Sequence, residues 1–370
     1  CGMENIDPVG VHTGDSFCVA PMLTISKEVQ EQLQDYAYRI VDAIGVTGGT
    51  NVQFAHNRED GRIIVIEINP RTSRSSALAS KATGCPIAVL STKMASGVTL
   101  DEMPYWRDGS MDKYTPSGDY VVVKFARWAF EKFPQAKDAL GTQMKAVGEV
   151  MSIGANFKEA MQKAIRSLEI GRAGLGMVKQ WEKLSAAELK EKLHVPSSER
   201  YFQIYEAFKK GVTVEEVFKQ TKIGKWFLTQ IWELAQFELK LAACNWMSLD
   251  DALLVQAKKD GFSDKYLAKI FNVPVDIITL DAAETVNQAL GEFADKLDRA
   301  RLIPVFRQPE ETVEMMARRS SGAPWYGMGC SSPLSCSSMV WRISLDHTVK
   351  GKLSAEIELV TRSRRYSSSF

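Results

Sequence analysis

The sequence lacks the features that would place it in several large classes of protein. No run reaches the roughly 18 apolar residues of a membrane-spanning helix, and no basic stretch followed by an apolar core opens the chain, so we expect no membrane partner and no signal peptide. Lysine and arginine number 46 against 45 aspartate and glutamate, which gives no electrostatic reason to expect a nucleic acid partner. The six cysteines are dispersed without a CxxC pair, which argues against disulfides or zinc and favours a reducing, cytoplasmic location.

Common catalytic motifs are missing as well. The chain has no GxGxxG, no nucleophile elbow and no Gly-Lys-Ser/Thr ending of a Walker A loop. His56, His194 and His347 do not have the spacing of metal ligands. What is present is 370 residues, 45% hydrophobic and 25% charged, the composition of a globular protein with two or three domains.

Four blocks follow one another along the chain. Residues 1–171 mix helix and strand signals, residues 172–275 are almost entirely short helices, and residues 276–317 carry one uncertain helical segment, with a helical pattern over 281–301. The end of the chain, residues 318–370, is rich in serine and without periodicity, so we expect it to be irregular, disordered or aberrant.

Apolar spacing, caps and turn residues predict the elements of the first block. In chain order they are a helix over 27–44, a hairpin of 51–55 and 62–68, a helix over 73–82, a strand over 120–125 and a helix over 156–168. In the second block, capping-box pairs mark helix starts at Ser185 and Thr213. We expect the aromatic and apolar residues of that block to form its core: Tyr201, Phe202, Tyr205, Phe208, Trp226, Phe227, Ile231, Trp232 and Phe237.

The predicted hairpin carries the strongest group of polar residues. Glu67 and Asn69 alternate along the second strand and therefore share one face, and Gln53 on the partner strand can approach Glu67 across the ladder. One carboxylate and two amide oxygens suit Mg²⁺ or Mn²⁺. The alternative is an edge strand with a polar outer face, which alternation alone also predicts.

Two further segments could bind an anion. Arg71 and Arg74 lie among hydroxyl residues at the start of the short helix, where guanidinium groups and backbone N–H groups hold phosphate or carboxylate; the alternative is an ordinary N-cap with solvated arginines. The loop of residues 10–16 contains two glycines and two hydroxyl residues, which allows close approach of a ligand, although a surface turn would look the same. His12 in this loop could be a general base, but no nucleophile can be assigned to it.

The same residues resemble a known family, the large chain of carbamoyl-phosphate synthase. The similarity is carried by Met3–Asp7, Gly10–Ser16, Thr47–Phe54, Val65–Arg71 and Ser73–Gly84, the last reading SRSSALASKATG, and continues through Phe130–Phe133 and Thr142–Met151. This part is similar to the second half of the ATP-grasp domain that makes carboxyphosphate. The helical block that follows, up to about residue 273, resembles the family's helical oligomerisation domain. The resemblance therefore implies an α/β (α+β) partial ATP-grasp domain over 1–171 followed by an all-α helical domain over 172–275.

The resemblance implies ATP and two Mg²⁺ or Mn²⁺ ions as cofactors. Gln53 and Glu67 match ligands of one ion, and Glu67 with Asn69 match ligands of the second. Gly10, Val11 and His12, with Gln53 and Glu67, match residues that bind ATP. The remaining matches, near the transferred phosphoryl group and carboxyphosphate, are Arg71, Arg74 and Asn51.

The family reaction phosphorylates bicarbonate on the way to carbamoyl phosphate for arginine and pyrimidine synthesis, with ammonia from a separate glutaminase small chain. The resemblance also implies a homo-oligomer. Because the family's domain begins before Cys1, we expect a truncated fragment that is inactive alone. The alternatives are a non-catalytic association module and another ATP-grasp carboxylase or ligase, against which the helical block argues.

Overall fold

The computed structural model describes residues 1–104, 109–114, 116, 118–275 and 278, and these form two compact units. The first unit comprises residues 1–243 with 258–263, and the second comprises 244–257 with the residues described from 264 onward. Because the first unit runs through position 171, the predicted domain boundary there stays a prediction. The predicted helix over 281–301 and the tail from 318 lie outside the described residues.

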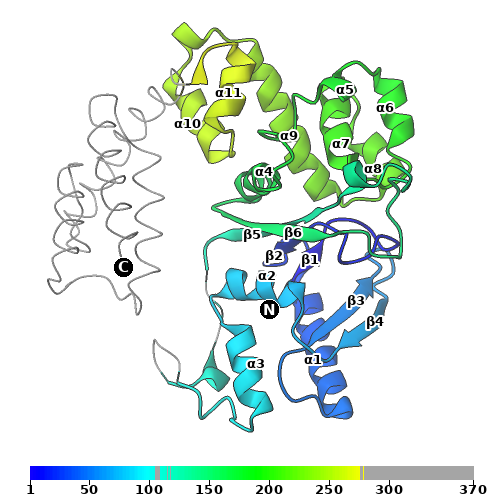
Figure 1. Ribbon diagram of the computed structural model, residues 1–370, viewed down its shortest axis with the longest axis vertical. Coiled ribbons are helices and arrows are strands. Elements are labelled where there is room, and N and C mark those ends of the chain that lie inside the picture. The colour runs from blue at the N-terminus through cyan, green and yellow to red at the C-terminus, as the bar shows by residue number, and fades with distance from the viewer. Residues whose placement is uncertain (105–108, 115, 117, 276–277, 279–370) are drawn as a thin grey trace, which may run out of the picture. The chain divides into compact units, whose positions relative to one another are not determined.

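A four-stranded antiparallel sheet lies at the centre of the first unit (Figure 1). Its strands, in spatial order, are β1 (Glu4–Asn5), β2 (Cys18–Ala20), β5 (Val121–Arg127) and β6 (Gly148–Gly154). Val123 of β5 lies opposite Val19 on one side and opposite Ser152 on the other. The sheet thus places strands from the start of the chain beside strands that follow the predicted hairpin and helix.

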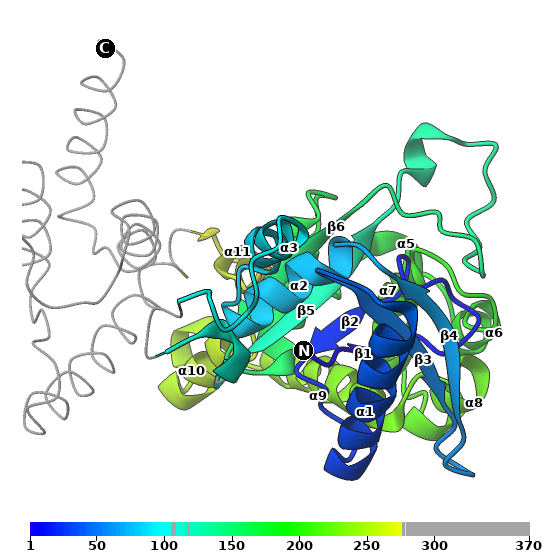
Figure 2. The same ribbon diagram turned by 90° about the horizontal axis from the view of Figure 1, so that it is seen from below.

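Helices cover both faces of this sheet, which explains why β5 is apolar almost throughout. Successive side chains of a strand point to opposite faces, so Val122 and Val123 belong to different halves of the core. Leu78 of α2 (Arg74–Thr83) packs with Val122 and Ala20, and Figures 1 and 2 show α2 lying along β5. The opposite face is covered by α4 (Phe157–Ser167), and α3 (Ile87–Ala95) packs beside α2.

The predicted hairpin forms a separate two-stranded sheet of β3 (Asn51–His56) and β4 (Ile63–Asn69) (Figure 2). Gln53 pairs with Glu67, and the register shifts by a bulge between Gln53 and Phe54. The hairpin prediction is therefore confirmed. Ile64, Ile66 and Ile68 alternate along β4 and give it an apolar face, which is largely uncovered among the described residues, since Ile64 and Ile66 are 45% and 50% exposed.

Helix ends follow the local sequence closely. The predicted helix over 27–44 is α1 (Lys27–Ile44), where Ser26 Oγ accepts from Val29 N and Gly45 ends the helix at a φ of 71°. α4 begins as expected, because Asn156 Oδ1 accepts from Glu159 N at 2.9 Å. Asn156 and Glu159 have the spacing of a capping box in the sequence, but the Glu159 carboxylate accepts from Ala155 N instead, so the second half of that box does not form.

The helical part of the first unit comprises α5 (Lys179–Glu182), α6 (Ala186–Lys192), α7 (Arg200–Lys209), α8 (Val214–Thr221) and α9 (Lys225–Ala242). Capping boxes at Ser185 and Thr213 start α6 and α8 as predicted. Most of the expected core residues are buried, but the prediction is wrong for Trp226 and Trp232, which are 41% and 39% exposed. The sequence could not separate them from the core, because a helix with apolar residues all round does not reveal which stripe is covered.

The second unit contains α11 (Asp264–Phe271) and most of α10 (Asp251–Lys259), and the rings of Trp246 and Phe271 pack with centroids 5.2 Å apart. Short 3₁₀ turns occur at Met111–Lys113, Phe130–Lys132 and Trp246–Ser248. Among the described residues, no helix combines the length and apolar character needed to cross a membrane.

Candidate functional site

Polar side chains at one end of the hairpin form a hydrogen-bonded cluster, which we call the hairpin cluster: Asn51, Gln53, Glu67, Asn69 and Arg71. Gln53 Nε2 donates to Glu67 Oε1 at 2.9 Å, and Asn69 Nδ2 donates to the same oxygen at 2.8 Å. Gln53 Nε2 also lies 3.3 Å from Asn51 Oδ1. The register explains the cluster, since Asn51 pairs with Asn69 and Gln53 with Glu67. The approach of Gln53 to Glu67, expected from alternation, is thus present.

Arg71 extends the cluster toward α2. Its NH2 group donates to Asn69 Oδ1 at 3.3 Å and its NH1 group to Thr72 O at 3.4 Å, both long and exposed contacts. These contacts are weak enough for the guanidinium to exchange them for an anionic ligand. The structure therefore places Arg71 beside the carboxylate and amide groups of the hairpin cluster.

Arg74 is the first residue of α2, at the positive end of the helix dipole. Ser73 N donates to Ser76 Oγ at 3.0 Å, so hydroxyl groups supply part of the capping at this end. A helix N-terminus with an arginine favours a bound anion. The sequence predicts Arg74 at the start of a helix soon after the hairpin, and the structure confirms this position.

Glu149 on β6 was not expected at a site. Burial raises the pKa of its carboxyl, although the nearby cations Lys124 and Arg74 act to lower it. Glu149 Oε2 is buried and has no hydrogen-bond partner among the described residues. Glu149 lies opposite Ala126, and Lys124 lies opposite Met151, so both charged side chains project from the sheet face that α2 covers. A single acid in an apolar strand is the only sequence signal that could have pointed to it.

In the loop of residues 10–16, a backbone hydrogen bond sets the state of His12. Gly14 N donates to His12 Nδ1 at 2.9 Å, so Nδ1 is the acceptor nitrogen and the ring proton lies on Nε2. His12 therefore presents a donor, not the basic nitrogen considered from the sequence, unless the Gly14 contact is broken. Gly10 has a φ of 115°, which only glycine adopts without strain, and Val11 turns its side chain into the core at 8% exposure.

Hydrogen bonds connect some of the predicted site residues but not others. Asn51, Gln53, Glu67, Asn69 and Arg71 are linked by hydrogen bonds, but within the described residues no hydrogen bond connects Gly10, Val11 or His12 to them. The described part of the chain also contains no cluster of three or more His, Cys, Asp or Glu that could hold a metal. A metal at the hairpin would therefore depend on one carboxylate and neighbouring amides.

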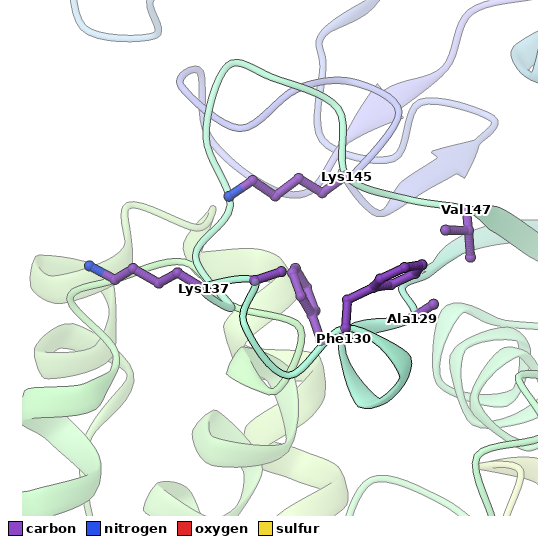
Figure 3. Close-up of a pocket in the computed structure, with 7 residues that line it drawn as sticks. Ala129, Phe130, Lys137, Lys145 and Val147 are labelled. Carbon is purple, nitrogen blue, oxygen red and sulfur yellow. The ribbon is translucent and has the colours of Figure 1, made fainter.

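A surface cavity of about 330 Å³ is lined by residues between positions 129 and 147, in the segment that joins β5 to β6 (Figure 3). Its walls include the rings of Phe130 and Phe133, and Lys137 and Lys145 stand at its side. None of the predicted site residues lines it. This cavity is thus separate from the polar cluster, and its lining offers no acid or hydroxyl group for catalysis.

Two family models match the chain. The carbamoyl-phosphate synthase L chain, ATP binding domain, matches residues 1–103, and the carbamoyl-phosphate synthetase large chain, oligomerisation domain, matches residues 149–285. The two matched ranges together span more than half of the chain. The chain belongs to the family of carbamoyl-phosphate synthase large chains.

Relatives of this synthase family match over about three quarters of the chain. The carbamoyl phosphate synthase large chain of Archaeoglobus fulgidus is 50% identical over 282 residues, which are 74% of this chain and 26% of that protein. The carbamoyl phosphate synthase large chain, N-terminal section, of Methanopyrus kandleri is 45% identical over 291 residues, 75% of this chain and 52% of that protein. The chain thus spans between a quarter and about half of the length of these relatives.

The chain has only low similarity to a solved biotin carboxylase structure. The biotin carboxylase domain of a thermophilic 2-oxoglutarate carboxylase bound to bicarbonate matches 60% of this chain and 53% of that one, at 13% identity and a TM-score of 0.34. That similarity is too low to carry conclusions. The predicted fold class, an α/β ATP-grasp part followed by helices, is confirmed for the described residues by the synthase family matches and the element order.

Proposed function

We propose that the chain binds ATP with Mg²⁺ or Mn²⁺ and takes part in the phosphorylation of bicarbonate that leads to carbamoyl phosphate. The observation that carries the proposal is the hairpin cluster, in which Asn51, Gln53, Glu67, Asn69 and Arg71 converge within the range matched by the ATP-binding family model. A phosphoryl-transfer site needs hard oxygen ligands for a cation and arginines for the transferred group. Both kinds of group are adjacent here.

The donor set fits one or two divalent ions. Gln53 and Glu67 would hold one, and Glu67 with Asn69 the second. Both amide side chains now donate N–H groups to Glu67 Oε1, so each must turn its oxygen toward an ion. A bound ion would neutralise charge on the ATP phosphates. The single carboxylate keeps the ligand charge low, which suits ions that retain water and phosphate oxygens as further ligands.

The remaining residues act by binding and orientation. Gly10 and Val11 offer backbone groups, and His12 offers Nε2–H, to the nucleotide phosphates. Arg71 and Arg74 neutralise and orient the acceptor anion and the transferred phosphoryl group, with Asn51 beside them. Catalysis of this kind consists mainly of positioning and charge stabilisation.

The wider setting is part of the same proposal. Ammonia would come from glutamine through a separate glutaminase small chain, and the product would serve arginine and pyrimidine synthesis in the cytoplasm. Support for this setting comes only from membership of the synthase large-chain family.

Bicarbonate-dependent release of phosphate from ATP with Mn²⁺ tests the proposal. It should be measured for the chain alone and for a chimera in which this chain replaces the matched region of the Archaeoglobus fulgidus relative. We expect bicarbonate to stimulate the chimera and Arg74→Ala to reduce that rate by about 100-fold, the usual cost of losing a charge-stabilising group. Comparison of the two proteins also tests the expectation that the chain alone is inactive.

The matched control is Arg39→Ala, which removes an exposed arginine of α1 that lies 3.7 Å from Asp35. This variant should retain the full bicarbonate-dependent rate. A chimera without bicarbonate stimulation, or an Arg74→Ala chimera as active as its parent, would contradict the proposed function.

A second proposal concerns self-association through the helical part. It is supported by the match to the oligomerisation domain and by Trp232 and Leu239, exposed apolar residues seven positions apart on α9 and therefore on one face. We expect light scattering to show a dimer or larger species that Trp232→Lys dissociates. A monomeric wild-type chain would contradict this proposal without affecting the first.

A further inference from the structure

Two buried charged residues tie the loop of residues 10–16 to the rest of the first unit. Asp15 lies within the loop and is fully buried, and Lys124 lies on β5 at 4% exposure. Neither is among the residues to which the proposed function gives a role. Burial of a charged group is costly unless several hydrogen bonds compensate for it, so their partners indicate what they do.

Asp15 ties the loop to the segment that leads into β6. Its Oδ1 accepts from Ala146 N at 2.6 Å and from Trp128 Nε1 at 3.1 Å, and its Oδ2 accepts from Lys145 N at 2.9 Å. All three partners are N–H donors. A carboxylate offers acceptors at both positions, whereas an asparagine would turn an NH₂ group toward one of these donors.

Lys124 binds the backbone of the same loop. Its Nζ donates to Thr13 O at 2.9 Å and to Gly14 O at 3.4 Å. Carbonyl groups held in this way fix the peptide planes on either side of Gly14, including the Gly14 N–H that donates to His12 Nδ1. The ammonium therefore acts on the same hydrogen bond that sets the His12 tautomer.

The backbone around the loop leaves little freedom for another conformation. His12 N donates to Gly141 O at 2.7 Å. A Cβ added at Gly14 would lie 2.6 Å from Met144 Sδ and 3.1 Å from His12 Nδ1, so the loop is packed closely against the segment that Asp15 binds. Gly10 lies at the surface and His12 is half-exposed, which leaves them accessible to a ligand.

We propose that Asp15 and Lys124 are positioning residues that preorganise this loop for nucleotide phosphates. They hold His12 with its proton on Nε2 and keep the Gly10–His12 backbone in the conformation that receives the ligand. The proposal rests on the proposed function, because it takes ATP as the ligand. Preorganisation strengthens binding by removing the entropy cost of ordering the loop when the nucleotide arrives.

The test uses Asp15→Asn and Lys124→Met in the full chain. The matched control is Asp138→Asn, because the Asp138 carboxylate also accepts two hydrogen bonds, but from a residue outside the loop, with Ser198 N at 2.9 Å and Ser198 Oγ at 2.6 Å. Three measurements are made on each variant: ATP affinity by titration calorimetry with Mg²⁺, amide hydrogen exchange at residues 12–16, and the ¹⁵N shifts of the His12 ring.

Both loop variants should bind ATP at least about tenfold more weakly, since each loses hydrogen bonds to a charged group. Amide exchange at residues 12–16 should accelerate, and the His12 ring should lose its single tautomer. Asp138→Asn should change none of the three, even where it lowers the melting temperature equally. A merely structural role for Asp15 and Lys124 would lower the melting temperature without moving the tautomer signal.

The measurements separate a failure of the proposed function from a failure of the positioning role. A wild-type chain that does not bind ATP would overturn the proposed function and, with it, the nucleotide role of the loop. Unchanged exchange and an unchanged His12 tautomer in Asp15→Asn and Lys124→Met would overturn the positioning role, whatever the wild type binds. Faster exchange with unaltered ATP affinity would also overturn it, because the loop would then be held but not used.

Discussion

Replacing Glu67 by glutamine should separate the metal-binding role of the hairpin from its structural role. The substitution keeps the shape of the side chain and removes its negative charge. Glu67 Oε1 accepts from Gln53 Nε2 at 2.9 Å and from Asn69 Nδ2 at 2.8 Å. Glu67 is the one carboxylate in the hairpin cluster, so its charge is the main attraction for a cation.

The structure indicates how much Glu67→Gln should change the free energy of unfolding and the Mn²⁺ affinity. Because Glu67 is exposed, its cross-strand contacts contribute about 0.2–1 kcal/mol to the free energy of unfolding. Metal binding must break two hydrogen bonds worth about 0.5–1.5 kcal/mol each, a cost of about 1–3 kcal/mol that the carboxylate's attraction for the ion offsets. With a neutral amide at position 67 that offset is lost, so we expect Mn²⁺ affinity to fall at least about tenfold, or about 1.4 kcal/mol.

Electron paramagnetic resonance of free Mn²⁺ measures the affinity, and urea unfolding of the same samples measures stability. Glu59→Gln is the matched control, because it removes the same charge from the loop at the other end of the hairpin. Equal Mn²⁺ affinity in the wild type, Glu67→Gln and Glu59→Gln would refute the metal assignment. Equal weakening in the two variants would show that overall charge, not coordination, is responsible.

Three further predictions concern stability and pH. Leu78→Ala should lower the free energy of unfolding by about 2–5 kcal/mol in urea titrations, because Leu78 is fully buried between α2 and the sheet, whereas the same change at the exposed Leu239 should cost below about 1 kcal/mol. Burial raises the Glu149 pKa, so the contribution of this carboxyl group to stability is present below pH about 4 and is lost as pH rises. Glu149→Gln should therefore be more stable than the wild type at pH 7 and equal to it at pH 4. The hydrogen bond from Thr213 N, with Lys190 nearby, lowers the Glu216 pKa to about 2. The contribution of Glu216 to stability is therefore present above pH about 4.3 and is lost as pH falls. An NMR titration that gives an ordinary pKa for Glu216 would contradict the capping box.

Much of the candidate site could be predicted because its geometry is local. Alternation along residues 63–69 placed Glu67 and Asn69 on one face, and the short loop after His56 set a register that brings Gln53 opposite Glu67. The starts of α1 and α8 at Ser26 and Thr213 were equally predictable, since a cap satisfies N–H groups only two or three residues away. Resemblance to the synthase family then assigned roles that these patterns alone left open.

Only the tertiary structure decided the rest. The sequence by itself determined several of the helices and strands, the place of the hairpin cluster and the family to which the chain belongs, because these depend on neighbouring residues and on recognisable motifs. It did not show that Lys124 binds the loop carbonyls at Thr13, that Asp15 accepts from Lys145 and Ala146, or that His12 carries its proton on Nε2. Those properties arise where β2, β5 and β6 bring distant segments together and exclude water, and a buried charged residue takes its hydrogen-bond partners from that surrounding structure.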